Sequence, residues 1–155
     1  MTGGILVLVG LAILVAGPPG VEVIPLPAGS WLADLAREAD YVDTFRMRVA
    51  PDEFPDVASL DALAFQKGEL VERNAHEVVY RGNAPGLRFW VRYAVDPGGP
   101  SVEMSTVVQY LDSKGRLYFA FVRPIHRIGV PWMFRRQVNR ARRVIREQSG
   151  VISDT

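Results

Sequence analysis

Between residues 40 and 49 the chain alternates between apolar and polar positions. Strict alternation predicts a half-buried β-strand, because successive side chains of a strand point to opposite faces of its sheet. The apolar parity is made up of Tyr41, Phe45, Met47 and Val49. Asp43 shares that parity, so the pattern places one carboxylate on the buried face of the strand.

Four further stretches with strand-like composition lie between residues 77 and 122. Each is rich in β-branched and aromatic residues, and the first three end in sequences that favour turns, namely GNAPG, DPGGP and DSKG. The stretches are residues 77–81, 87–95, 101–111 and 116–122, the last of which reads RLYFAFV. Strands joined by such short turns predict an antiparallel meander.

Three segments have the features of helices. Ser30 is suited to cap a short helix over residues 31–38. Leu60, Leu63 and Ala64 recur at helical spacing and predict a second helix. Beyond the last strand-like stretch the apolar period changes to four and three residues, with arginines between, which predicts a long amphipathic C-terminal helix. The apolar face of that helix consists of Val130, Phe134, Val138, Ala141 and Ile145.

This order of elements predicts an α+β fold of the helix-grip type, in which a curved antiparallel sheet wraps around the C-terminal helix. Such a fold leaves a cavity between the concave face of the sheet and the helix. The domain would span residues 21–148, between an apolar segment at 1–20 and a tail at 149–155. His126 would then lie where the last strand meets the helix, at one end of the cavity.

The N-terminal segment contains a run from Gly4 to Gly17 without any polar side chain. A membrane-spanning helix needs about 20 apolar residues, although about 17 can suffice. Three interpretations stay open: a short membrane anchor, a strand or helix buried in the fold or in an oligomer contact, and a cleaved signal peptide. The protein is therefore expected to be either cytoplasmic or membrane-associated, with residues 4–17 as the membrane contact.

The composition of the chain limits which metals, cofactors and partners can be expected. The chain has no cysteine, and its two histidines lack metal-binding spacing, so we expect neither a metal nor a cofactor. Acidic side chains predominate up to residue 112 and basic ones after it. The basic part could meet an anionic partner or dock on the acidic part of the same chain. Aromatic residues do not alternate with its arginines, so nucleic acid is not an expected partner.

Asp43 and His126 are the candidate catalytic residues. A carboxylate on a buried strand face is costly unless it is paired, and burial tends to raise its pKa, which suits a general acid or base. The alternative for Asp43 is a structural role, either in a salt bridge to Arg123 or in a hydrogen bond that holds the fold. His126 could exchange protons near neutral pH, or it could instead fix the junction through a backbone hydrogen bond.

Ligand-binding residues are predicted where polar side chains point to the same face of the sheet as the apolar residues that would line the cavity. Tyrosine hydroxyls would orient a ligand, an arginine would bind a carboxylate or enolate, and apolar side chains would enclose the rest. The predicted set is Tyr41, Phe89, Tyr93, Met104, Thr106, Tyr110 and Arg123. On the opposite face, Arg88, Trp90 and Arg92 are expected to face solvent, with Glu103 as a cross-strand partner.

The stretch TVVQYLDSKGRLYFAFVRPIHRIGVPWMFRR resembles the end of a bacterial family of unknown function, domain-of-unknown-function family 2867. An opening motif, ADYVDTF, also resembles that family, so the resemblance covers roughly residues 38–136. Ile125 stands where an aromatic residue is usual. The matching positions are Asp40, Tyr41, Asp43, Phe45, Thr106, Val108, Gly115, Arg116, Tyr118, Pro124, His126 and Arg127.

The family is similar to the START and polyketide-cyclase superfamily, and the resemblance therefore implies a ligand cavity. The expected function is that of a small-molecule-binding helix-grip protein, with cyclase or isomerase activity on a polyketide-like or other apolar oxygenated substrate. The alternative is a non-catalytic, membrane-associated module that binds lipids or other hydrophobic molecules. A third interpretation is an oligomer whose cavity is filled by its own side chains. Whether the protein is an enzyme, and whether it forms a homo-oligomer, stays open.

Overall fold

The computed structural model describes residues 17–51, 53–54, 56–63, 68–96 and 98–152. Except for Gly17, the apolar run 4–17 lies outside the described residues, so its three interpretations stay predictions. Within the described part of the chain, no helix is both long enough and apolar enough to cross a membrane.

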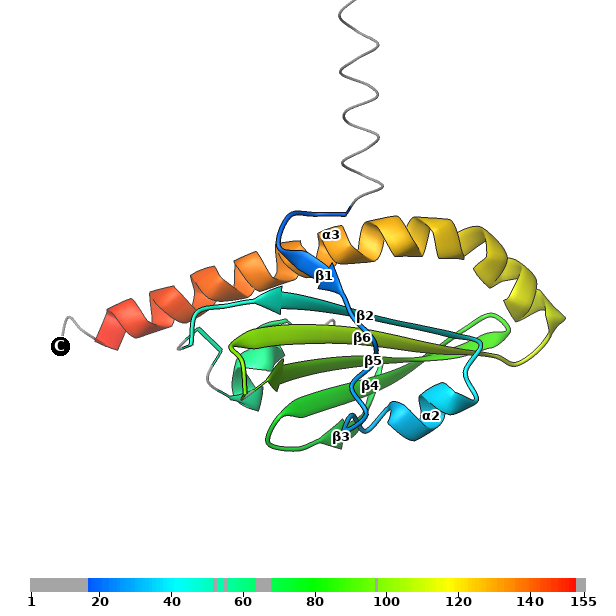
Figure 1. The fold of residues 1–155 in the computed structure, drawn as a ribbon, viewed down its shortest axis with the longest axis horizontal. Coiled ribbons are helices and arrows are strands. Elements are labelled where there is room, and N and C mark those ends of the chain that lie inside the picture. Colours follow the sequence, from blue (N-terminus) through cyan, green and yellow to red (C-terminus); the bar gives the residue numbers. More distant parts are fainter. Residues whose placement is uncertain (1–16, 52, 55, 64–67, 97, 153–155) are drawn as a thin grey trace, which may run out of the picture.

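The fold is built on one six-stranded antiparallel sheet (Figure 1). Its strands are β1 (Val21–Val23), β2 (Tyr41–Arg48), β3 (Glu69–Arg73), β4 (Glu77–Ala84), β5 (Leu87–Asp96) and β6 (Ser101–Tyr110). They lie in the order β1-β2-β6-β5-β4-β3, so β6 pairs with β2 on one side and with β5 on the other. The strand predicted at 40–49 is confirmed as β2, and the first three strands of the predicted meander are confirmed as β4, β5 and β6. Strands β1 and β3 were not predicted.

One long helix, α3 (Ser113–Ile152), packs along one face of the curved sheet (Figure 1). The core on that side contains Phe134, Val138 and Ala141, all fully buried, as the spacing of the C-terminal helix predicted. The arrangement confirms the predicted α+β class and is consistent with helix-grip architecture.

The other face of the sheet is covered by the short helix α2 (Ala33–Arg37) and the segment that precedes it (Figure 1). This helix begins later than predicted, and the Ser30 hydroxyl accepts a hydrogen bond from the backbone of Leu32 instead of capping the helix itself. Leu32 packs with Trp90 in a second core, and Arg92 is only 6% exposed. The expectation that Trp90 and Arg92 face solvent is wrong, because this cover removes their face of the sheet from water.

Arg92 tolerates burial because carboxylates surround it. It donates to Glu77, and its second guanidinium nitrogen donates to Glu103 at 3.0 Å. Arg46 donates to the same Glu103 from the neighbouring strand at 2.6 Å. The predicted cross-strand partnership with Glu103 is therefore confirmed, as part of a buried ion network in which each charge has a partner.

The prediction of a last strand at 116–122 is wrong, because these residues form the first turns of α3. Asp112 accepts a hydrogen bond from the backbone N–H of Gly115 at 2.8 Å, so the DSKG sequence starts a helix instead of a turn. The predicted meander is therefore confirmed for its first three strands, β4, β5 and β6, but a fourth strand could not extend it, since β6 already has a neighbour on each side. The predicted helix around Leu60 is a short 3-10 helix, η1 (Val57–Ala62), and Ala64 lies outside the described residues.

Candidate functional site

Helix α3 bends as it passes over the sheet (Figure 1). Pro124 and Pro131 lie inside it. A proline within a helix removes one backbone hydrogen bond and crowds the preceding turn, which bends the helix axis. His126 lies between the two prolines, so the histidine is carried on the bent part of the helix.

Three side chains meet between β2 and this part of α3. The Tyr41 hydroxyl donates a hydrogen bond to Asp43 Oδ2 at 2.7 Å. His126 Nδ1 lies 3.2 Å from the same oxygen, close enough for an ion pair although not aligned as a hydrogen bond. Alternation in β2 brings Tyr41 and Asp43 to the same face, as the sequence predicted. Asp43 thus pairs with His126 and accepts a hydrogen bond from Tyr41, whereas the described residues show no salt bridge between Asp43 and Arg123.

Aromatic packing holds the cluster in place. The rings of Tyr41 and His126 meet edge to face with centroids 5.6 Å apart, and Phe119 lies 5.0 Å from Tyr41. The Arg123 guanidinium lies 5.5 Å from the centre of the Tyr41 ring, within cation–π range. Burial raises the pKa of Tyr41, and the charge of Asp43 and the hydrogen bond to it raise the pKa further. Tyr41 therefore stays protonated and keeps donating to Asp43 well above neutral pH.

Two buried oxygens on this face have no hydrogen-bond partner among the described residues: Asp43 Oδ1 and Thr106 Oγ1. Asp43 on β2 and Thr106 on β6 are directly opposite each other in the strand register. Buried polar atoms are nearly always hydrogen-bonded in folded proteins. This pair is therefore a place where a ligand or water would find unused hydrogen-bonding capacity.

A pocket of about 330 Å³ lies between α3 and the concave face of the sheet. His126 and Thr106 line it, and most of its other lining side chains are aliphatic or aromatic. The pocket includes four of the predicted ligand-binding residues, namely Phe89, Tyr93, Met104 and Thr106.

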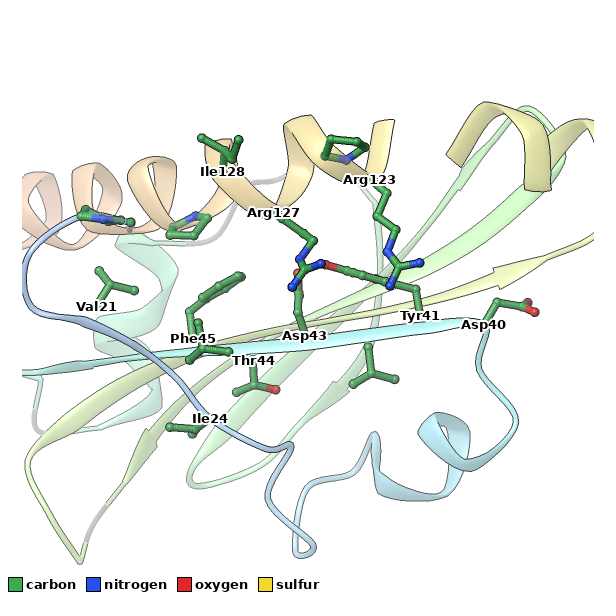
Figure 2. A pocket seen from close by; sticks show the side chains of 16 residues that line it. Val21, Ile24, Asp40, Tyr41, Asp43, Thr44, Phe45, Arg123, Arg127 and Ile128 are labelled. Carbon is green, nitrogen blue, oxygen red and sulfur yellow. The ribbon is translucent and has the colours of Figure 1, made fainter. Parts of the chain in front are cut away.

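A second, larger groove of about 670 Å³ lies on the other side of the bent helix, against β1 and β2. Asp43, Tyr41, Arg123 and Arg127 line it. In Figure 2 both arginines extend from α3 toward β2, with Arg127 directed at Asp43. Neither arginine forms a salt bridge in the described part of the chain. The Asp43–His126 pair therefore separates two cavities, since Asp43 lines one and His126 lines the other.

The predicted site residues thus divide between two places. Tyr110 belongs to neither cavity; it packs against Phe119 at 5.8 Å near the start of α3. Five pocket residues on α3 were missed: Tyr118, Phe119, Val122, Val130 and Met133. Reading residues 116–122 as a strand concealed the first three, and the capping pattern that begins at Asp112 was the available signal.

Within the described ranges, no group of three or more histidine, aspartate or glutamate side chains is arranged to hold a metal ion. The polar groups that line the cavities are one histidine, the two carboxylates of Asp40 and Asp43, hydroxyls and two arginines. These groups can bind an oxygen function of an organic molecule and can move a proton.

An antiparallel sheet curved around a long C-terminal helix, with a pocket between them, places the protein among α+β folds consistent with helix-grip architecture. Residues 69–133 match the model of a family described as "Protein of unknown function (DUF2867)". The match includes residues 115–127 (GRLYFAFVRPIHR), which lie within the C-terminal stretch that resembles the family, but not the ADYVDTF motif on β2. No curated protein and no solved structure matches the chain.

Proposed function

We propose that the protein binds a compact, mainly apolar molecule with a carbonyl or enol oxygen in the 330 Å³ pocket, and that His126 moves a proton on it. The observation that carries the proposal is the position of His126. Its ring lines the apolar pocket, and its Nδ1 lies 3.2 Å from the Asp43 carboxylate on the far side. This is the arrangement in which a carboxylate orients a histidine for acid–base chemistry.

The chemistry follows from the tautomer of the imidazole. A carboxylate beside Nδ1 favours the neutral form that has its proton on Nδ1, which leaves the lone pair on Nε2. Nε2 can then remove a proton from a carbon next to a ligand carbonyl, producing an enolate. If the enolate carbon attacks a second carbonyl of the same molecule, a ring closes, and the proton held on Nε2 neutralises the new alkoxide. The Asp43 charge stabilises the imidazolium between these two steps.

Substrate class follows from the lining. A pocket of about 330 Å³ lies at the lower end of the range for small-molecule sites, which favours a compact molecule. Thr106 Oγ1, which lacks a partner in the described chain, would hydrogen-bond to the ligand oxygen. An enclosed ligand would be held in one conformation, which favours one ring closure over others. A START-like or polyketide-cyclase-like activity is part of this proposal, and the family match by itself assigns no activity.

Ligand occupancy is the first test. Native mass spectrometry of the purified protein, followed by solvent extraction, should find a co-purifying apolar molecule. Ala84 lines the pocket, so Ala84→Phe should fill part of it and reduce the amount of bound molecule. Ala75→Phe is the matched control, because Ala75 is exposed in the turn before β4. Equal occupancy in both variants would contradict the pocket assignment.

Proton transfer is the second test. The extracted molecule, deuterated next to its carbonyl, should exchange deuterium for solvent hydrogen in the presence of the protein. His126→Gln should lose this exchange by about 10²–10⁴-fold, the usual contribution of a general base. His76→Gln should keep it, since His76 is exposed and lies outside both cavities.

A non-catalytic module that binds lipids or other hydrophobic molecules is the second candidate. Large apolar side chains exposed on α3, among them Phe121 and Ile125, favour contact with lipid. Under this alternative the extracted molecule would bind equally to wild type and His126→Gln, and neither protein would catalyse deuterium exchange.

A further inference from the structure

The outer side of the first half of α3 carries a line of exposed apolar side chains. Leu117, Phe121 and Ile125 recur every four residues and are 63%, 73% and 72% exposed. Residues four apart in a helix lie on one face. Contiguous apolar patches on a soluble monomer are typical of interaction surfaces.

The core does not explain this line. Phe119, Val122 and His126 are the side chains of the same turns that face the sheet and its pocket. The helix is thus apolar on two sides along this stretch, although only one side packs against its own domain.

The charged side chains of α3 from Ser113 to Arg146 have one sign, although Asp40 and Asp112 lie near Arg116 at the start of the helix. No acidic residue occurs between Ser113 and Arg146. Lys114 and Arg116, next to the apolar line, are exposed and form no salt bridge within the described residues. An apolar helix face with basic neighbours suits a surface that offers both hydrocarbon and negative charge, as an anionic lipid bilayer does.

The course of the chain adds a separate observation. Gly17 and Pro18 line the larger groove together with Arg127 and Ile128 of α3. The uncharged apolar run that begins at Gly4 therefore ends beside this helix. If that run enters a bilayer, it does so next to the exposed apolar line.

We propose that the outer face of α3 around Leu117, Phe121 and Ile125 docks on the surface of an anionic lipid bilayer. The three side chains enter the boundary between headgroups and acyl chains, and the neighbouring basic side chains contact lipid phosphates. The proposal does not depend on the enzymatic function proposed above.

The chain has no cysteine, so one introduced cysteine gives a clean site for an environment-sensitive fluorophore. The full chain carrying Ile125→Cys, labelled with nitrobenzoxadiazole, is mixed with vesicles of phosphatidylcholine and phosphatidylglycerol. The emission should shift to the blue and be quenched by nitroxide-labelled lipid. Leu70→Cys on β3 is the control, since Leu70 is also exposed and apolar but lies at the far edge of the sheet. Its label should keep the emission it has in water.

Substitution separates this surface from the N-terminal run. The double variant with Phe121→Ser and Ile125→Ser should partition into these vesicles at least about tenfold more weakly, whereas Leu70→Ser should bind as the wild type does. Replacing phosphatidylglycerol by phosphatidylcholine should weaken binding as well.

Three results would overturn the proposal. The label at position 125 could stay water-like while the protein sediments with vesicles, which would leave the N-terminal run as the contact. The protein could fail to bind vesicles at all. The blue shift could appear without lipid and grow with protein concentration, which would identify a second copy of the chain as the partner.

Discussion

Removal of the Asp43 side chain should destabilise the fold by an amount that the cluster geometry sets. Asp43 accepts from Tyr41 at 2.7 Å, and a hydrogen bond to a charged group contributes about 1.5–3 kcal/mol. Asp43→Ala also leaves the buried Tyr41 hydroxyl without its acceptor, which costs about 1–3 kcal/mol. The expected loss in free energy of unfolding is therefore about 3–5 kcal/mol.

Asp43→Asn should be much milder. The asparagine carbonyl still accepts from Tyr41, so the loss is the difference between a charged and a neutral acceptor, about 1 kcal/mol. Relief of the buried charge offsets part of even that, because Oδ1 has no partner among the described residues. Under the proposed proton transfer, turnover should nonetheless fall sharply, since the neutral amide would no longer stabilise the His126 imidazolium.

Urea unfolding followed by circular dichroism measures both variants. Asp34→Asn is the control, because its exposed carboxylate pairs with Arg37 one helical turn away, and the substitution should change stability by less than about 0.5 kcal/mol. Tyr41→Phe combined with Asp43→Ala should give a coupling energy of about 1–2 kcal/mol. Additive losses would refute the hydrogen bond. If Asp43→Ala costs no more than the control, Asp43 faces water. A catalytic role is excluded if Asp43→Asn keeps full turnover.

Three further outcomes are expected. Gly115→Ala should lower stability by about 3 kcal/mol, because a Cβ there would overlap the backbone of Gly86. Gly129→Ala in the same helix is the control: its Cβ would contact no neighbouring atom, so the variant should be neutral or stabilising. Equal melting temperatures of the two variants would contradict close packing between Gly115 and Gly86. Absorbance titration should find one tyrosine that ionises at a higher pH than the others, and this tyrosine should be missing in Tyr41→Phe. The raised pKa of Tyr41 contributes stability that is complete below the unfolded tyrosine pKa of about 10 and is lost as pH rises through the folded pKa. Deletion of residues 1–20 should leave a domain that melts cooperatively by circular dichroism, and loss of that transition would place the segment in the core.

The alternation of apolar and polar residues predicted most of the sheet, because successive side chains of a strand point to opposite faces and so alternate in burial. The alternation around Asp43 is the clearest example, since β2 has one face toward α3 and the other toward α2 and the segment that precedes it. The same logic failed for Arg92, because a strand sequence does not reveal whether its second face is covered. The error at residues 116–122 has a different cause: a helix that exposes apolar side chains on its outer face has no amphipathic pattern, so it resembles a buried strand.

Sequence pattern predicted the position of the part of the candidate site on β2 but not the position of the part on α3. Asp43 could be placed inward from its neighbours alone, whereas its partner depends on where a bent helix crosses β2. Pro124 and Pro131 indicate that a bend occurs, but its direction is set by packing between elements distant in sequence. The pocket residues contributed by α3 depend on that same crossing.

The two proposals predict compatible geometry at the start of α3. Tyr118 lines the apolar pocket and is 46% exposed, and it follows Leu117, the first residue of the exposed line. If that line rests on a bilayer, this edge of the pocket lies close to the acyl boundary. An apolar ligand would then pass between lipid and pocket with little exposure to water, which lowers the desolvation cost of entry and exit. Exchange of ligand should consequently be faster from anionic vesicles than from detergent-free solution, and Phe121→Ser with Ile125→Ser should remove that difference while leaving ligand affinity in solution unchanged.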